Sequence, residues 1–169
     1  MEGAEPGVRS GPQSRLPQML LWLTLGAILF LVVTRVLDRG KKQEGAGLVT
    51  WQPHENAAAA ARSAGRPVLY DFTAAWCGPC HRLDAEGWGD PQIASQVNRS
   101  YLPARVVDRD REDGKNPPAI EELERRYSVN AFPTLVVAAP DGRLIAKFQG
   151  YAGREKLYQF LQESSRKTP

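Results

Sequence analysis

The sequence predicts an α/β fold in which a central mixed β-sheet is covered by helices on both faces, preceded by one transmembrane helix. Helical and strand patterns alternate along residues 48–165, and this alternation is typical of helix-covered sheets. An uncharged apolar run near the N-terminus predicts the membrane helix. The chain has 169 residues, of which 42% are hydrophobic and 24% charged, so one globular domain with appendages is expected.

The elements of the sheet domain follow from local patterns. Residues 55–64 are rich in alanine and stop at Gly65, which predicts a helix. Residues 68–73 are an apolar run with β-formers, which predicts a buried strand that ends near the cysteines. Further elements are expected as a helix starting near residue 77, a helix over 91–98 capped by Asp90, a strand over 101–107, a helix over 118–127, strands over 134–138 and 144–148, and a helix over 154–162.

The N-terminal part predicts a membrane anchor. Residues 19–33, MLLWLTLGAILFLVV, contain no charge, and about 20 residues of helix cross a bilayer. A cleavable signal peptide with Arg9 and Arg15 as its basic region is the alternative, but the apolar part is long and no small-residue cleavage site follows closely. The predicted divisions are a tail over 1–15, the anchor over 16–37, a linker over 38–47, the sheet domain over 48–165 and a tail over 166–169.

Charge gives two indications about partners and orientation. The 22 basic and 19 acidic residues are spread without a long basic block, so nucleic-acid binding is not expected. Basic residues are more numerous after the apolar run than before it, and this places the sheet domain in the cytoplasm by the positive-inside rule. Those after the run are Arg35, Arg39, Lys41 and Lys42, and those before it are Arg9 and Arg15.

Residues 74–81, AAWCGPCH, hold both cysteines of the chain. A working cysteine needs its thiolate stabilised. The start of a helix supplies backbone N–H groups and the positive end of a dipole to Cys77, while Cys80 lies one turn inside on the same face. This context predicts thiol–disulfide exchange in which Cys77 attacks and Cys80 resolves.

Two other sites fit the same letters. Cys-x-x-Cys-His is also a signature for covalent haem, but outside the motif only Met1, Met19 and His54 offer a second axial ligand, and the methionines lie outside the domain. A zinc site from both cysteines, His81 and His54 has irregular spacing. We therefore expect no cofactor and no metal, and His81 is expected to be an exposed helix residue.

The motif YDFTAAWCGPC, residues 70–80, resembles the active-site signature of the thioredoxin family. NAFPT, residues 130–134, is similar to the cis-proline loop of that family, and Gly150 also matches. The Trp51 segment, GRPVLYDF and GWGDPQI resemble membrane-linked members, such as the reducing C-terminal domain of the electron carrier DsbD.

The resemblance implies a thioredoxin fold and several residue roles. Pro133 would be cis, Phe132 would offer backbone hydrogen bonds to a substrate strand, and Asp71 would be a buried acid below Cys80. Trp76 would lie at the surface beside the thiols, where it and Pro133 contribute to catalysis and substrate binding. A core position for Trp76 and an ordinary loop proline at 133 are the alternatives. The lysine that the family often places near the buried acid corresponds in this reading to Ala104, with Arg105 beside it.

The segment between Asp108 and Pro133, which begins with a charged stretch over 108–118, is longer than a minimal member of the family needs. Asp108, Asp110, Glu112 and Asp113 hint at a calcium loop, but Asp113 stands where an EF-hand needs glycine. We expect a solvated loop here.

The predicted function is a membrane-tethered thiol–disulfide oxidoreductase that reduces protein disulfides through the Cys77–Cys80 pair. Its expected partners are protein disulfide substrates, an upstream thiol electron donor and the membrane, contacted through residues 16–37; a monomer is expected. The resemblance favours a periplasmic sheet domain, against the count of basic residues. A non-enzymatic thioredoxin-fold adaptor and a c-type haem carrier are the alternatives.

Overall fold

The computed structural model describes residues 22–28, 30 and 48–168, which fall into two units divided between Glu44 and Gly45. In the first unit, residues 22–28 and 30 are helical. No helix within the described ranges combines the length and the apolar character that crossing a bilayer requires. The predicted tail over 1–15, most of the predicted anchor over 16–37 and the linker over 38–47 lie outside the described residues.

The second unit is built on a five-stranded mixed sheet with the order β1-β3-β2-β4-β5. The central strand β2 pairs in parallel with β3 and antiparallel with β4. At the two edges, β1 is parallel to β3 and β5 is antiparallel to β4. The strands are β1 (Gln52–Pro53), β2 (Val68–Ala74), β3 (Leu102–Asp108), β4 (Thr134–Ala138) and β5 (Leu144–Gln149).

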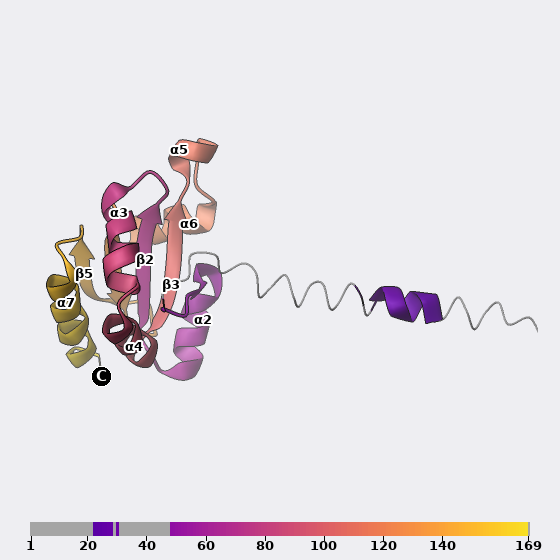
Figure 1. Cartoon of the computed structure of the whole chain (residues 1–169), viewed down its shortest axis with the longest axis horizontal. Helices are drawn as coiled ribbons and strands as arrows, with labels where there is room; N and C mark the ends of the chain where they lie inside the picture. The colour runs from indigo at the N-terminus through magenta and orange to yellow at the C-terminus, as the bar shows by residue number, and fades with distance from the viewer. Residues whose placement is uncertain (1–21, 29, 31–47, 169) are drawn as a thin grey trace, which may run out of the picture. The chain divides into compact units, whose positions relative to one another are not determined.

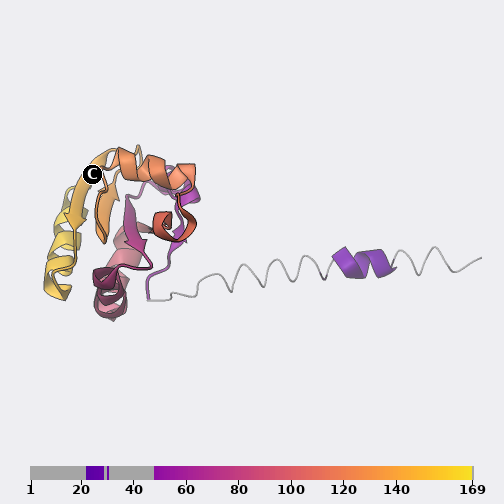
Figure 2. The same cartoon turned by 90° about the horizontal axis from the view of Figure 1, so that it is seen from above.

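Helices cover both faces of this sheet, as predicted (Figures 1 and 2). One face packs against α2 (His54–Ala64) and α6 (Pro118–Arg126). The other face packs against α3 (Gly78–Arg82), the π-helix η1 (Leu83–Trp88), α4 (Pro91–Ser100) and α7 (Arg154–Arg166). The element order and the mixed sheet of the predicted thioredoxin fold are therefore confirmed.

Strand β2 is buried along its whole length, and successive side chains of a strand point to opposite faces. Tyr70 and Phe72 accordingly join the core beneath α2 and α6, whereas Leu69 joins the core beneath α4 and α7. Asp71 shares the side of Leu69 by this alternation. A buried carboxyl group therefore enters the layer that also contains the cysteine helix.

The helix boundaries match their sequence signals closely. Helix α2 ends at Gly65, whose φ of 61° is in the left-handed region that glycine tolerates. Helix α4 begins after Asp90, whose Oδ1 accepts hydrogen bonds from the N–H groups of Gln92 and Ile93 at 2.8 and 3.1 Å. Pro91 occupies the first helical position, where a missing N–H group leaves no intrahelical bond unmade.

Three elements differ from the expectation. Strand β1 has two residues, which is too short for a periodic pattern. The helix that begins at the cysteines continues as a π-helix from Leu83 to Trp88. The segment over 108–118 is not simply a solvated loop, because it contains the short helix α5 (Asp110–Asp113) and buries Asp108 and Asn116.

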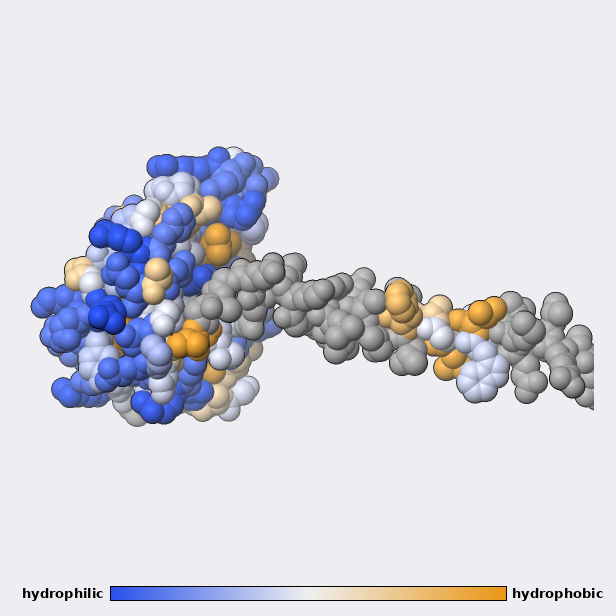
Figure 3. Space-filling view, viewed as in Figure 1, coloured by the Kyte–Doolittle hydropathy of each residue, from blue (hydrophilic) through white to orange (hydrophobic). Residues whose placement is uncertain are grey.

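Hydrophilic side chains dominate the face of the sheet domain seen in Figure 3, including the end that carries α5. Large exposed apolar side chains are few among residues 48–168: Leu48, Trp76, Val107 and Leu144. Trp76 is the one of these that stands next to a cysteine.

Candidate active site

Both cysteines lie just beyond the C-terminal end of β2. After Ala74 the chain turns, with the N–H of Cys77 donating to the carbonyl of Ala74 at 3.1 Å. Cys77 is the N-cap of α3, and its Sγ accepts a hydrogen bond from the N–H of Cys80 at 3.2 Å. The sequence folds this way because Pro79 suits the first turn of a helix, where its N–H group is not needed. The predicted helix start at the cysteines is confirmed.

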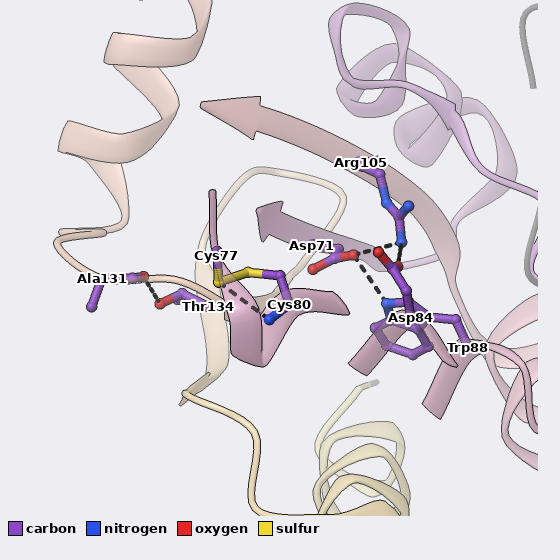
Figure 4. The surroundings of a disulfide bond; sticks show 8 residues. All are labelled: Asp71, Cys77, Cys80, Asp84, Trp88, Arg105, Ala131 and Thr134. Carbon is purple, nitrogen blue, oxygen red and sulfur yellow. Dashed lines mark hydrogen bonds and ion pairs between the residues drawn. A yellow bond between two sulfur atoms is a disulfide. The ribbon is translucent and has the colours of Figure 1, made fainter. Parts of the chain in front are cut away.

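Cys77 and Cys80 form a disulfide, with their Cα atoms 5.3 Å apart. Cys77 is 2% exposed and Cys80 is 1% exposed, and together with Ala74 they form a small buried cluster against which Phe132 packs. Figure 4 shows this disulfide beside the loop that carries Ala131 and Thr134. The disulfide is therefore largely covered, and Phe132 is one of the side chains that cover it.

The loop opposite the disulfide has the predicted conformation. The Phe132–Pro133 peptide bond is cis. The hydroxyl group of Thr134 donates to the carbonyl of Ala131 at 2.7 Å, and the N–H of Gly150 donates to the carbonyl of Pro133 at 2.7 Å. Gly150 has a φ of 82°, a value that favours glycine. The proline is therefore held between the end of β5 and the start of β4.

Trp76 lies at the surface, with 42% of its area exposed, as expected from the resemblance. Its ring meets the ring of Phe132 edge to face, with centroids 5.8 Å apart. The guanidinium group of Arg111 also lies over the Trp76 ring, with its Cζ 3.5 Å from the ring centroid. The surface beside the disulfide is therefore a row of Phe132, Trp76 and Arg111.

Asp71 is 1% exposed and has two hydrogen-bond donors. Its Oδ2 accepts from Trp88 Nε1 at 3.0 Å and from Arg105 Nη2 at 3.1 Å. Its Oδ1 has no hydrogen-bond partner among the described residues. In Figure 4 this side chain lies between the disulfide and Arg105, with Cys80 on the Asp71 side of the disulfide. The predicted burial of the acid is therefore confirmed, and one of its oxygens has no hydrogen-bond partner among the described residues.

The basic partner of Asp71 is Arg105, and the reading that placed the family's lysine at Ala104 was wrong. The β2–β3 register pairs Asp71 with Arg105, whereas Ala104 pairs with Tyr70 and is buried beneath the other helix layer. A shift of one residue moves a side chain to the opposite face of a sheet. Arg105 therefore supplies the positive charge beside the buried acid.

Burial raises the pKa of Asp71 to about 6, because an ionised carboxylate loses its hydration inside the protein. The positive charge of Arg105 opposes this increase, and the negative charge of Asp84 adds to it. The hydrogen bonds from Trp88 and Arg105 also lower the pKa, since they favour the ionised form. A group with this pKa exchanges a proton near neutral pH.

Arg105 is the centre of a larger assembly. Its guanidinium group forms ion pairs with both Asp71 and Asp84. Its Cζ also lies 4.6 Å from the centroid of the Trp51 ring, and Trp51 meets Trp88 edge to face at 5.3 Å. Asp84 is more exposed than Asp71. The assembly therefore extends from the buried acid to the protein surface.

The two histidines lie in different layers. His81 is exposed on α3, as expected, whereas His54 begins α2 on the opposite face of the sheet, where it pairs with Glu55 at 3.6 Å. In the part of the chain that the structure describes, no group of three or more His, Cys, Asp or Glu residues is placed to hold a metal ion. The sulfur atoms of Cys77 and Cys80 are bonded to one another.

Of the site residues that the sequence indicated, Phe132 packs against Cys77 and Cys80, Trp76 contacts Phe132, and Pro133 follows Phe132 in the chain. Asp71 lies on the Cys80 side of the disulfide in Figure 4. Sequence reasoning did not assign roles to Asp84, Trp88 or Arg111. Asp84 follows Cys80 by four residues, and this helical spacing is the one local signal that places it on the cysteine face. Chemically, a disulfide is the oxidised form of a dithiol, and such a pair can exchange two electrons with another disulfide.

Comparison with known proteins agrees with this geometry. The chain is 31% identical over 96 residues to a protein disulfide-isomerase of Hordeum vulgare, a match that covers 57% of this chain and 17% of that protein. It is 33% identical over 100 residues to probable thioredoxin-2 of Caenorhabditis elegans, covering 57% of this chain and 58% of that one. The match therefore spans less than two thirds of either relative.

The C-terminal domain of Neisseria meningitidis DsbD in its reduced form shares the fold, with a TM-score of 0.52 and 20% identity over 63% of this chain and 89% of that domain. Residues 54–165 match the sequence profile of the family described as the thioredoxin-like domain. Because this match covers more than half of the chain and includes the whole cysteine site, the chain belongs to the thioredoxin-like family.

Proposed function

We propose that this chain is a membrane-tethered thiol–disulfide oxidoreductase that reduces disulfides in other proteins. The observation that carries the proposal is the Cys77–Cys80 disulfide at a helix start beside a cis proline. The family match and the relatives named as thioredoxin and protein disulfide-isomerase support it. The Gly78-Pro79 pair resembles that of reducing members of the family, which supports the direction.

The proposed reaction begins with the reduced dithiol. The Cys77 thiolate attacks one sulfur of a substrate disulfide, forms a mixed disulfide and releases the other substrate sulfur as a thiolate. The Cys80 thiolate then attacks Cys77, closes the disulfide of this chain and releases the second substrate thiolate. Two electrons pass to the substrate, and a thiol donor must return them to the Cys77–Cys80 pair.

Asp71 accepts the proton of Cys80 in this proposal. Cys80 must lose a proton before it attacks, and a nearby carboxylate whose pKa is about 6 is mostly ionised at neutral pH. The free Oδ1 of Asp71 supports this role, since Oδ2 is already occupied by Trp88 and Arg105. Arg105 and Trp88 orient the carboxyl group.

The backbone of Phe132 pairs with the substrate segment, next to the cis proline. Phe132 packs against the cysteine cluster, so a segment that pairs with its backbone lies next to the disulfide. The contact between Trp76 and Phe132 supports a continuous apolar surface for that segment. Both residues therefore position the substrate and leave the electron transfer to the cysteines.

The tether is the apolar segment over 16–37. Residues 22–28 and 30 are helical, and the large apolar side chains among them are exposed: Trp22, Leu23, Leu25, Ile28 and Phe30. Exposed apolar side chains in a helix favour insertion into lipid. We further propose that the sheet domain faces the periplasm, in keeping with the resemblance to membrane-linked reducing members and against the basic residues that follow the span.

The test compares purified full-length chains in a turnover assay with a disulfide-bonded protein and excess thiol reductant. Wild type is expected to accelerate reduction, while Cys77→Ser is inactive because it lacks the attacking sulfur. Cys80→Ser should accumulate a reducible covalent adduct with substrate, which the Cys77→Ser/Cys80→Ser chain lacks. Wild-type activity no higher than that of Cys77→Ser would refute the catalytic proposal.

The same Cys80→Ser chain tests location. Adducts captured in cells and isolated after acid quenching are expected to contain periplasmic proteins and to remain in the membrane fraction after an alkaline wash. Adducts with cytoplasmic proteins alone would reverse the proposed orientation. Release of the full-length chain by the alkaline wash would contradict the tether.

A further inference from the structure

We propose that Arg111 gives this site a preference for disulfides flanked by a carboxylate side chain in the substrate protein. The preference rests on the proposed function, because it concerns which disulfides the Cys77–Cys80 pair attacks. The binding surface is the row of Arg111, Trp76 and Phe132, which we call the aromatic–arginine row.

The sheet register places the segment that carries Arg111 at the same end of the sheet as the cysteines. The last residue pair of the parallel strands β2 and β3 is Ala74 and Asp108. The segments that follow these two residues therefore leave the sheet at the same end of the strands. Trp76 and Cys77 follow Ala74, and α5 with Arg111 follows Asp108. Figure 1 shows α5 at the end of the sheet where the β2–α3 connection lies.

The stacking of Arg111 leaves its hydrogen-bonding edge available. Its guanidinium group lies over the face of the Trp76 ring at 3.5 Å from Cζ to the centroid. A guanidinium group that stacks through its face keeps its N–H donors in the plane, where they match the two oxygens of a carboxylate. Trp76 therefore orients Arg111 and does not consume its donors.

Helix α5 is anchored at both ends, so this placement is built into the fold. The buried side chain of Asn116 accepts from the N–H of Arg109 at 2.7 Å and donates to the carboxylates of Asp108 and of Glu124 on α6. Arg109 Nε in turn donates to Asp113 Oδ2 at 2.7 Å across the turn. These bonds fix the segment that carries Arg111.

Arg111 has no acidic partner within the described residues. The ion pairs found there are made by His54, Arg105, Arg109, Arg125, Arg126 and Arg154. Asp113 of the same helix is already paired with Arg109. The positive charge of Arg111 is thus available to a carboxylate supplied by a substrate.

In the mixed disulfide, the substrate segment lies along the aromatic–arginine row. Its sulfur is bonded to Cys77, its backbone passes Phe132, and a Glu or Asp beside its cysteine reaches Arg111. The ion pair forms with the bound substrate and adds no redox step, so the electron and proton balance of the exchange is unchanged. Substrates with a lysine at this position would meet a like charge.

The experiment uses the full-length chain and disulfide-bonded peptides that are identical except for one residue, Glu or Lys, placed directly before or directly after the attacked cysteine. The readout is the Glu/Lys ratio of kcat/KM at each position. Because both peptides meet the same Cys77 thiolate, the ratio cancels any effect on the thiol itself. An exposed ion pair predicts a ratio of about fivefold in favour of Glu at one of the two positions.

Arg111→Glu is expected to reverse the ratio, Arg111→Gln to bring it close to one, and Arg111→Lys to retain part of it. The matched control is Arg125→Gln, which removes an exposed arginine of α6 and is expected to keep the wild-type ratio. A Glu preference that persists in Arg111→Glu would overturn the proposal, as would equal rates for both peptides with wild type. If wild type reduces no peptide and Cys80→Ser forms no adduct, the proposed function itself fails and the preference falls with it.

Discussion

At the scale of single side chains, Asp71 and Arg105 form an ion pair, in which Asp71 is buried, beneath the helix that carries the cysteines. A carboxyl group in the middle of an apolar strand costs folding free energy when it ionises. Its two donors, Trp88 and Arg105, offset only part of that cost, and the pKa of Asp71 remains raised to about 6. Ionisation of Asp71 at neutral pH is therefore expected to cost stability.

Asp71→Asn is expected to stabilise the oxidised protein at neutral pH. The folded-state pKa of Asp71 exceeds its unfolded value, so its contribution to stability is fully present below about pH 4 and is lost as the pH rises through about 6. The difference of about two pKa units corresponds to roughly 3 kcal/mol at pH 7.5 as an upper bound. Urea unfolding of wild type and Asp71→Asn should therefore diverge as the pH is raised from 4 to 7.5.

The control for the loss of one negative charge is Glu163→Gln, which changes an exposed residue of α7. The increase in unfolding free energy caused by Asp71→Asn should be larger at pH 7.5 than at pH 4. An equal increase at both pH values would mean that ionisation of Asp71 does not cost stability.

Substitutions of the two charged neighbours of Asp71 should move its pKa in opposite directions. Arg105→Gln removes a positive charge that favours the carboxylate, so the pKa of Asp71 should rise above about 6. Asp84→Asn removes a negative charge and frees Arg105 for Asp71, so the pKa should fall below that value. The carboxyl carbon shift of Asp71, followed by NMR across pH, measures both. Shifts of the same sign in both variants would contradict the assembly around Arg105.

At the scale of elements, the continuous helix formed by α3 and η1 connects the cysteines to the acid. It starts at Cys77 and ends with Trp88, whose indole donates to Asp71. Its last turn is a π-helix, which is uncommon and often found at functional sites. Gly87 within this turn and Gly89 just after it are both closely approached by other atoms. A Cβ at Gly87 would lie 2.7 Å from Leu157 Cδ2, and one at Gly89 would lie 2.6 Å from the carbonyl oxygen of Ala85.

Gly89→Ala is therefore expected to destabilise the fold. The atom that its Cβ meets belongs to the backbone of η1, so the π-turn itself must move, at a cost of roughly 1–3 kcal/mol. Gly78→Ala is the matched control, because a Cβ there meets no described atom within 4 Å. Denaturant unfolding of the oxidised chains measures both. Equal midpoints for the two variants would show that η1 accommodates a side chain at Gly89 without strain.

At the scale of the whole molecule, the sheet domain has its own complete core. Its two main clusters of buried side chains, one on each face of the sheet, lie entirely within residues 48–168. The hydroxyl group of Tyr101 also ties the start of β3 to α7 by donating to the carbonyl of Leu161 at 2.6 Å. Among the described residues, the two clusters and this hydrogen bond all lie within residues 48–168.

We accordingly expect residues 48–169 to fold without the N-terminal segment. Thermal unfolding of this fragment should be cooperative and should have the same midpoint as the sheet domain in the full-length chain, because none of the core contacts is removed. A fragment that lacks near-ultraviolet circular dichroism, or that melts well below the full-length chain, would show that residues before 48 stabilise the domain.

The sequence by itself determined the fold class, most helix and strand positions, and the cysteine pair, because these depend on residues that are close together in the chain. Asp90 caps helix α4, and Gly65 ends helix α2. Cys77 and Cys80 are three residues apart, so a helix that starts at Cys77 places them about one turn apart. The cis state of Pro133 was also predictable, but only through the resemblance of its motif to a known family.

Only the tertiary structure decided which distant side chains meet. The strand register selected Arg105 instead of Ala104 as the partner of Asp71, since a change of one residue reverses the face of a strand. The tertiary fold also brings Trp88 to the carboxyl group of Asp71, which lies 17 residues away in the sequence. It brings Arg111 to the face of Trp76, which lies 35 residues away. Contacts of this kind follow from sheet register and packing, and no local pattern in the sequence encodes them.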